Sequence, residues 1–79
     1  MSRITKDAAF EKAVEYIREN REVQGEPRMG YYEYYPKSEE SPASHSVDIF
    51  FDNMVFVVNV YDESEEVEIV IEKDRSDVE

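Results

Sequence analysis

The spacing of apolar residues near the N-terminus predicts an amphipathic helix over residues 5–20. Apolar side chains recur there every three or four positions, which is the repeat of one helix face; they are Ala9, Phe10, Ala13, Val14 and Ile17. Thr5 stands where an N-cap residue is expected, and Asp7 follows in the first turn, where a negative charge suits the helix dipole. We interpret the acidic stripe on the opposite side as a solvent-exposed face; it contains Asp7, Glu11, Glu15 and Glu19.

Beyond this helix the pattern changes to one typical of β-strands. Gly25 and Pro27 break the helical repeat, and a tyrosine-rich strand is predicted over residues 29–35. The polar residues 37–45 contain three serines and one proline, so we expect an exposed loop there. Three further strands follow, over residues 46–51, 54–61 and 66–72.

Two turns predict the register of these last three strands. Asp52 and Asn53 are suited to a two-residue hairpin turn, and residues 62–65 form the next connection. The facing pairs expected from the two turns are Phe51–Met54, Ile49–Phe56, Val47–Val58, Val60–Val67, Val58–Ile69 and Phe56–Ile71. Both turns lead to the same apolar face, and a face of this kind specifies register strongly. We therefore expect the helix to cover that face.

These elements predict an α+β fold. One N-terminal helix packs on an antiparallel sheet of about four strands, in the order α-β-β-β-β. Residues 1–79 form a single domain. Residues 73–79 are expected to fray, as chain termini often do.

The other face of the predicted sheet has an apolar centre with an acidic rim. The centre consists of Phe50, Val55, Val57 and Val70, and the rim of Asp48, Glu66, Glu68 and Glu72. Monomeric proteins rarely expose such a patch without a purpose, and this arrangement is typical of binding surfaces. Alternatively, a second copy of the chain, or the tyrosine-rich strand folding back, covers it.

Four tyrosines in the first strand have two interpretations. Tyrosine supplies rigid contact area with a polar tip, which suits a protein interface. It also completes cores and shields strand edges. Because alternate residues of a strand point to opposite faces, we expect a mixture of both roles among Tyr31, Tyr32, Tyr34 and Tyr35.

The net charge lies almost entirely in the second half of the chain. Residues 1–37 hold seven bases and seven acids, whereas residues 38–79 hold thirteen acids and two bases, which accounts for the whole net charge of −11. Such a field attracts basic partners and repels nucleic acid and anionic membranes. The many aromatic residues argue against a disordered acidic tail.

Motifs for catalysis or for ligand binding are missing from the sequence. There is no cysteine, and the single histidine, His45, falls in the predicted loop, where we expect no special role for it. The acidic residues 62–66 lack the pattern of a calcium loop, and two glycines are too few for a phosphate-binding loop. We therefore expect no enzymatic activity, no catalytic residues, no cofactor and no metal.

The chain also lacks an apolar run of the length that a signal peptide or a membrane span requires. Together with the absence of cysteine, this favours a location in the cytoplasm and no membrane partner.

In size, acidity and lack of a catalytic motif the chain resembles the small phage anti-CRISPR and anti-restriction proteins, and less closely the acidic immunity proteins that neutralise nuclease toxins. The likeness is one of composition and carries over no residues. It implies a protein of the host-cell cytoplasm that blocks a bacterial nucleic-acid-targeting complex by binding it stoichiometrically, and DNA mimicry is one form that such binding takes.

We accordingly expect a basic nucleic-acid-binding protein or complex as the partner, and no direct contact with nucleic acid. The expected partner-binding residues are Asp48, Phe50, Val57, Tyr61, Asp62, Glu63, Glu65, Glu66, Glu68 and Glu72. The alternative is a homodimeric structural or adaptor module in which acidity serves solubility. Adaptation to high salt fits less well, because it predicts acids throughout the chain and the first 37 residues are neutral.

Overall fold

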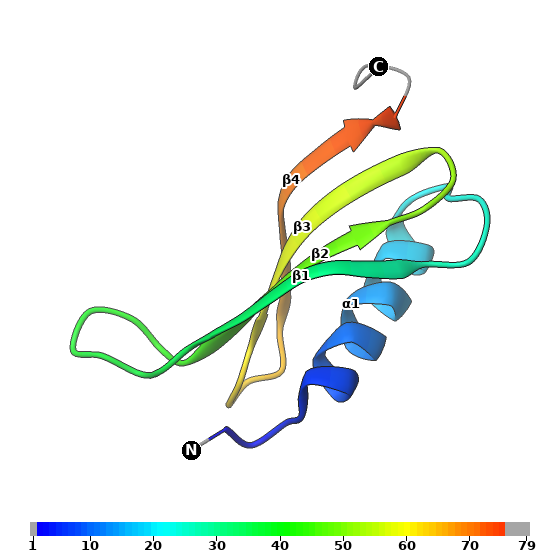
Figure 1. Ribbon diagram of the computed structural model, residues 1–79. Coiled ribbons are helices and arrows are strands. Elements are labelled where there is room, and N and C mark those ends of the chain that lie inside the picture. Colours follow the sequence, from blue (N-terminus) through cyan, green and yellow to red (C-terminus); the bar gives the residue numbers. More distant parts are fainter. Residues whose placement is uncertain (1, 76–79) are drawn as a thin grey trace.

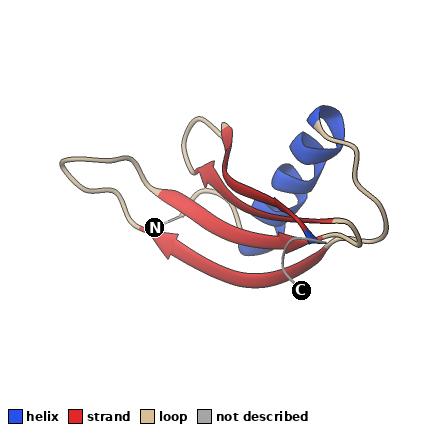
Figure 2. Cartoon of the chain, turned by 90° about the horizontal axis from the view of Figure 1, so that it is seen from above, coloured by secondary structure: helices blue, strands red, loops and turns tan. Residues whose placement is uncertain are grey.

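One helix and four strands, in the order expected from the sequence, make up residues 2–75, which is the part of the chain that this computed structural model describes. They are α1 (Lys6–Asn20), β1 (Arg28–Tyr35), β2 (Ser44–Phe50), β3 (Met54–Tyr61) and β4 (Val67–Asp74). The strands form one antiparallel sheet in the order β1-β2-β3-β4 (Figure 1). Figure 2 shows α1 on one face of this sheet. The predicted α+β fold is confirmed.

The start of α1 is fixed by its predicted cap. Thr5 has an extended backbone, and its Oγ1 accepts a hydrogen bond of 3.0 Å from the backbone N–H of Ala8. The helix ends where Arg21 returns to an extended conformation. On its inner face Ala9 and Ala13 are fully buried. Because alanine side chains are small, this part of the helix can approach the sheet closely.

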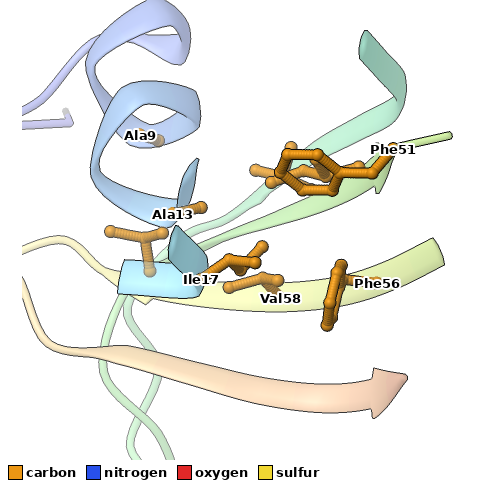
Figure 3. Packing of buried hydrophobic residues seen from close by; sticks show 9 residues of the cluster. Ala9, Ala13, Ile17, Phe51, Phe56 and Val58 are labelled. Atoms are coloured by element: carbon orange, nitrogen blue, oxygen red, sulfur yellow. The ribbon is translucent and has the colours of Figure 1, made fainter. Parts of the chain in front are cut away.

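The core lies between α1 and the central strands β2 and β3 (Figure 3). Phe51 and Phe56 meet edge to face at 5.9 Å between ring centroids, an arrangement that aromatic pairs favour. All nine residues of the central cluster have no exposed surface; they are Ala9, Ala13, Ile17, Val47, Ile49, Phe51, Phe56, Val58 and Val60.

Both predicted turns are present. The backbone N–H of Phe51 donates to Met54 O at 2.8 Å across Asp52 and Asn53. At the other end of β3, Tyr61 N–H donates to Glu66 O, also at 2.8 Å. Five of the six predicted facing pairs are therefore confirmed, namely Phe51–Met54, Ile49–Phe56, Val47–Val58, Val60–Val67 and Val58–Ile69.

The sixth pair is wrong because β4 contains a β-bulge. The register shifts between Val57 and Val58, so that Val58 pairs with Ile69 but Val57 pairs with Ile71. Val70 is the extra residue. A bulge of this kind moves every later side chain of the strand to the other face. Beyond it, Phe56 pairs with Glu72 and not with Ile71.

A second irregularity lies in β1, between Met29 and Tyr32. The ring of Phe50 occupies the space into which a side chain at Gly30 would extend. The absence of a side chain at Gly30 therefore lets this aromatic ring approach the neighbouring strand closely.

The predicted loop and tail boundaries need correction. The loop was expected to extend to residue 45, but β2 begins at Ser44, and Ala43, Ser44 and His45 are all buried. The predicted frayed tail began at residue 73. Yet β4 continues to Asp74, and Arg75 N–H donates to Asn53 O at 3.0 Å. Residues 76–79 of that tail lie outside the described residues.

Candidate functional site

The face of the sheet opposite α1, called here the outer face, carries most of the predicted binding residues. No other helix or strand among residues 2–75 covers it. The alternation of side chains and the observed register assign its members: Arg28, Tyr31, Glu33 and Tyr35 from β1, Ser44, Ser46, Asp48 and Phe50 from β2, Val55, Val57, Asn59 and Tyr61 from β3, and Glu68, Ile71 and Lys73 from β4.

The centre of the outer face is apolar, as predicted, but its composition differs. Phe50 pairs with Val55, and Val57 stands between Asp48 and Ile71. Ile71 occupies the place expected for Val70 because of the β4 bulge. The exposed fractions of Val70 and Ile71 are 51% and 47%, which is high for large apolar side chains.

Hydrogen bonds between tyrosines and glutamates hold the rim of the outer face. Tyr31 and Tyr35 donate their hydroxyl groups to Oε1 of Glu33, at 2.6 and 3.2 Å. Tyr61 donates to Oε1 of Glu68 at 2.8 Å. These carboxylates raise the pKa of all three phenols, through the hydrogen bond first for Tyr31 and Tyr61 and through the negative charge first for Tyr35. The rings are thus held in place before any partner arrives.

The four tyrosines of β1 are divided between the two faces of the sheet, because alternate residues of a strand point to opposite faces. Tyr31 and Tyr35 lie on the outer face with exposed fractions of 55% and 47%, whereas Tyr32 and Tyr34 are half-buried on the helix side, opposite Val47 and His45. The expected mixture of roles is therefore present.

Charges on the outer face are arranged in opposing rows. Arg28 and Lys73 flank Phe50 and Val55 at one end, whereas Glu33 and Glu68 occupy the row on the other side of Val57. The face is therefore acidic over one half and basic over the opposite end. The sequence prediction of a purely acidic rim missed this, because it omitted the first strand and placed Lys73 in a frayed tail.

The predicted partner-binding residues fall into three groups. Asp48, Phe50, Val57, Tyr61 and Glu68 lie together on the outer face, in agreement with the prediction. Glu63, Glu65 and Glu66 are exposed at the β3–β4 turn, at one end of that face. The remaining two are Asp62 and Glu72, and both were placed wrongly.

Asp62 is only 2% exposed and therefore cannot contact a partner. Glu72 lies on the helix side, because the bulge reverses its direction, and there it forms a two-pronged ion pair with Arg21. The Arg21 Nε and Nη2 atoms donate to the two carboxylate oxygens, each at 2.8 Å. This hydrogen bonding to Arg21 holds the pKa of Glu72 below its usual value, although burial opposes the shift.

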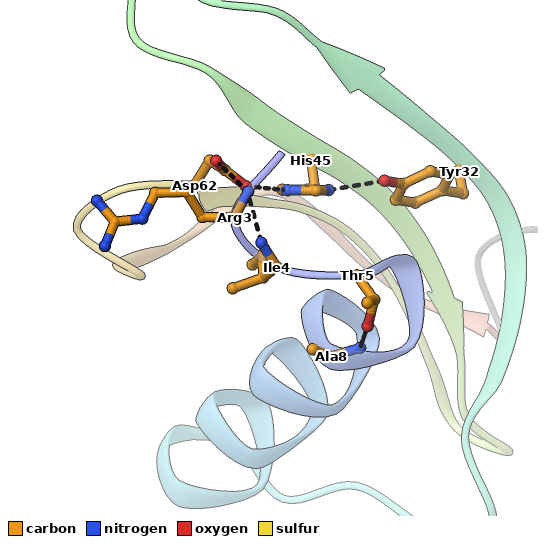
Figure 4. A network of polar contacts seen from close by, with 7 residues as sticks. All are labelled: Arg3, Ile4, Thr5, Ala8, Tyr32, His45 and Asp62. Carbon is orange, nitrogen blue, oxygen red and sulfur yellow. Dashed lines mark hydrogen bonds and ion pairs between the residues drawn. The ribbon is translucent and has the colours of Figure 1, made fainter. Parts of the chain in front are cut away.

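Asp62 belongs to a buried polar network that we did not predict from the sequence (Figure 4). Its Oδ1 lies 2.7 Å from Nε2 of His45, and its carboxylate also accepts the backbone N–H groups of Arg3 and Ile4, at 2.8 and 3.3 Å. The hydroxyl of Tyr32 lies 2.7 Å from the other ring nitrogen of His45. His45 was expected in an exposed loop, but its side chain is completely buried.

The sequence of carboxylate, imidazole and hydroxyl in this network has the order of a proton relay. Two observations argue for a structural role instead. His45 has no exposed surface, so a substrate cannot reach it. Burial and the charge of Asp62 raise the pKa of the Tyr32 phenol, which keeps the hydroxyl protonated and disfavours the phenolate that a nucleophile requires.

A groove of about 680 Å³ runs between α1 and the start of β4. Its wall on the helix side is formed by Lys12, Glu15, Tyr16 and Glu19, and its other wall by Tyr61, Glu65, Glu66, Val67 and Glu68. The acidic stripe of the helix is exposed, as predicted, and two of its four residues, Glu15 and Glu19, line this groove opposite the acidic β3–β4 turn. The helix and the turn are far apart in the sequence, so the sequence did not indicate that they lie close together.

Comparison with protein-family models, with curated protein sequences and with solved structures finds no match. Within residues 2–75, no group of three or more His, Cys, Asp or Glu side chains is placed to hold a metal ion. The same residues contain no helix with the length and apolar character that a membrane crossing requires.

Proposed function

We propose that this protein is a non-enzymatic, protein-binding inhibitor that uses the outer face of its sheet. The observation that carries the proposal is the apolar pair of half-buried Val57 and exposed Ile71 beside tyrosines already fixed by Glu33 and Glu68. Apolar and tyrosine contacts supply most of the energy of protein interfaces, and a polar rim surrounds them. Rings held in place before binding lose little conformational entropy on association.

The charge of the chain favours a basic partner. A net charge of −11 at 79 residues attracts lysine- and arginine-rich surfaces and repels nucleic acid. Surfaces that bind nucleic acid are rich in these bases. A protein that occupies such a surface excludes DNA or RNA from it, so binding alone is sufficient for inhibition.

The target that we propose is a bacterial defence complex such as CRISPR–Cas, and the location is the cytoplasm of the host cell. Support for this part comes from the likeness in size and charge to anti-CRISPR and anti-restriction proteins. A nuclease toxin neutralised by an immunity protein is the alternative target, and it would meet the same face.

A binding experiment with matched variants tests the proposal. The tagged chain is used to capture proteins from lysate of bacteria with active CRISPR–Cas, at about 50 and about 500 mM salt. We expect a nucleic-acid-binding complex that is released by high salt or by added DNA, because charge-matched contacts weaken as ions screen them. Asp48→Lys with Glu68→Lys should abolish capture, whereas the control Glu39→Lys with Glu40→Lys makes the same charge change in the exposed β1–β2 loop and should retain more of it. Equal capture by both variants would count against the outer face.

A homodimer through the same face is the second candidate, and the rows of charge favour it. Consider a two-fold axis that lies parallel to the outer face, runs perpendicular to the strands and passes Val57. A rotation of 180° about this axis places Lys73 of one copy opposite the row of the other copy that contains Glu68, and Arg28 opposite the row that contains Glu33. Such a contact is self-complementary, as a two-fold interface must be. Sedimentation of the purified chain over a range of concentrations distinguishes the two candidates: a dimer supports the second, and a monomer that captures a partner supports the first.

A further inference from the structure

The edge of β4 is open to another strand. Among residues 2–75, β4 pairs only with β3, so at the first residues of β4 the backbone groups on the far edge of the strand have no partner strand in the sheet. Tyr61 and Glu66 form a hydrogen-bonded pair of the two strands, because Tyr61 N–H donates to Glu66 O. Along an antiparallel ladder, hydrogen-bonded pairs alternate with pairs that are not hydrogen-bonded. The backbone groups of Glu68 therefore point to β3, whereas those of Val67 and Ile69 point to the free edge.

The groove described above lies along this edge, and one ion pair joins its two walls. Lys12 of α1 pairs with Glu65 within the groove, and a second pair, Arg21 with Glu72, joins α1 to β4 beyond the residues that line it. Between these pairs, Val67 and Ile69 are only half-buried, so α1 leaves this part of β4 accessible. The groove is consequently formed before any ligand binds.

The lining of the groove favours positive charge. Lys12 is its only basic residue, and Glu65 already pairs with it. Among the described residues, Glu15, Glu19 and Glu66 form no ion pair. Tyr16 stands between Glu15 and Glu19 on the helix with 37% of its surface exposed. An exposed aromatic ring beside carboxylates suits an arginine or lysine side chain, which can make ion pairs and lie over the ring.

We propose that this groove binds an extended segment of a partner protein that carries arginine or lysine at alternate positions, and that the segment joins β4 as a fifth strand. Its backbone pairs with Val67 and Ile69. Side chains on one side meet Glu15, Tyr16 and Glu19, and those on the other side pass Glu68. The bulge at Val70 interrupts the regular edge, so the segment is about five residues, or roughly 16 Å, long. Strand addition of this kind draws its affinity from main-chain hydrogen bonds and its specificity from alternate side chains.

Nuclear magnetic resonance of the full chain, titrated with the synthetic peptide Arg-Val-Arg-Val-Arg, tests this proposal. We expect the amide signals of Val67 and Ile69 to shift most, together with those of Glu15, Tyr16 and Glu19. The control peptide has the same sequence with methyl groups on alternate backbone nitrogens, which removes hydrogen-bond donors and keeps the charge. It should bind at least about tenfold more weakly. Equal shifts with both peptides, or shifts spread over all acidic surfaces, would show simple charge attraction and overturn the proposal.

Paired variants test the contribution of α1. Glu15→Gln with Glu19→Gln should weaken binding of the first peptide by about three- to tenfold, the range expected for two exposed ion pairs. Glu39→Gln with Glu40→Gln removes the same charge from the β1–β2 loop, which projects away from α1 in Figures 1 and 2, and should weaken it less than twofold. Equal effects of the two pairs would contradict the groove. The result is independent of the outer face, because Glu15 and Glu19 do not belong to it.

Discussion

His45 and Asp62 are 17 residues apart in the sequence, yet Nε2 of the first lies 2.7 Å from Oδ1 of the second in the buried end of the sheet. An ionised carboxylate only accepts hydrogen bonds, so the histidine nitrogen donates. Because Asp62 also accepts the N–H groups of Arg3 and Ile4, this pair ties β2 and the end of β3 to the segment that leads into α1. One buried network thus fixes the helix relative to the sheet.

Replacing His45 by phenylalanine should destabilise the protein strongly. The substitution keeps an aromatic ring but leaves the buried Asp62 carboxylate without its side-chain donor. Leaving a buried ionised group without a hydrogen-bond donor costs about 3 kcal/mol, which is most of the roughly 3–5 kcal/mol expected for a domain of this size. Urea unfolding at pH 7, followed by circular dichroism, measures the loss. Tyr32→Phe removes only a hydroxyl, should cost about 1 kcal/mol and serves as the control. Equal stability of His45→Phe and the natural protein would contradict this role.

Stability should also fall in acid because of Asp62. Burial alone would raise the pKa of its carboxyl group, but the hydrogen bonds from His45, Arg3 and Ile4 outweigh burial and hold the pKa below the ordinary value of 3.8. A carboxyl group with a lowered folded-state pKa stabilises the protein fully above its unfolded-state pKa, and this contribution disappears as the pH falls through the folded-state pKa. The free energy of unfolding should therefore decline below about pH 4.

Asp62→Asn isolates this contribution. The variant should be less stable at pH 7, and its free energy of unfolding should decline less steeply below pH 4 than that of the natural protein. Glu72, whose pKa is also lowered, is present in both proteins, so the difference between the two curves reports Asp62. Parallel curves would rule out the proposed linkage.

Hydrophobic alternation in the sequence was sufficient to predict the sheet and most of its register, and it also contained a signal for the buried network. His45 is in phase with Val47 and Ile49, which places it on the core face of β2. Asp62 is likewise in phase with Val58 and Val60. The polar composition around His45 obscured this signal, and sequence alone could not show that two polar side chains in phase with the core would be each other's partners.

The β4 bulge had a weaker signal in the sequence. Ile69, Val70 and Ile71 are three consecutive apolar residues. A strictly alternating strand would point at least one of these side chains away from the core. Which residue is the extra one depends on packing against β3 and α1, which the pattern does not report. For this reason the outer face was predicted in outline, whereas Ile71 and Glu72 were assigned to the wrong sides.

The contact between Gly30 and Phe50 yields a further prediction. A methyl group added at Gly30 would collide with the Phe50 ring, so Gly30→Ala should lower the free energy of unfolding by about 1–3 kcal/mol, as overpacking commonly does. The same substitution in a Phe50→Ala background should cost clearly less, because the obstructing ring is gone. A double-mutant cycle by urea unfolding measures the coupling between the two positions. Additive effects would show that the Phe50 ring is not the cause of the cost of Gly30→Ala.

The β4 bulge itself can be tested with two lysine substitutions, since it sends Ile69 and Ile71 to opposite faces. Ile71 is 47% exposed beside Val57 on the outer face, so Ile71→Lys should change the free energy of unfolding by no more than about 0.5 kcal/mol. Ile69 packs against the core on the helix side, and Ile69→Lys should cost about 2 kcal/mol or more, because a charge is brought against buried apolar groups. Urea unfolding of the two variants gives the comparison. A strand without the bulge would place both residues toward α1, so similar losses would contradict the observed register. If Ile71→Lys is as stable as expected, it is also suited to the capture experiment, where we expect it to capture less partner because a charge then stands in the apolar centre of the outer face.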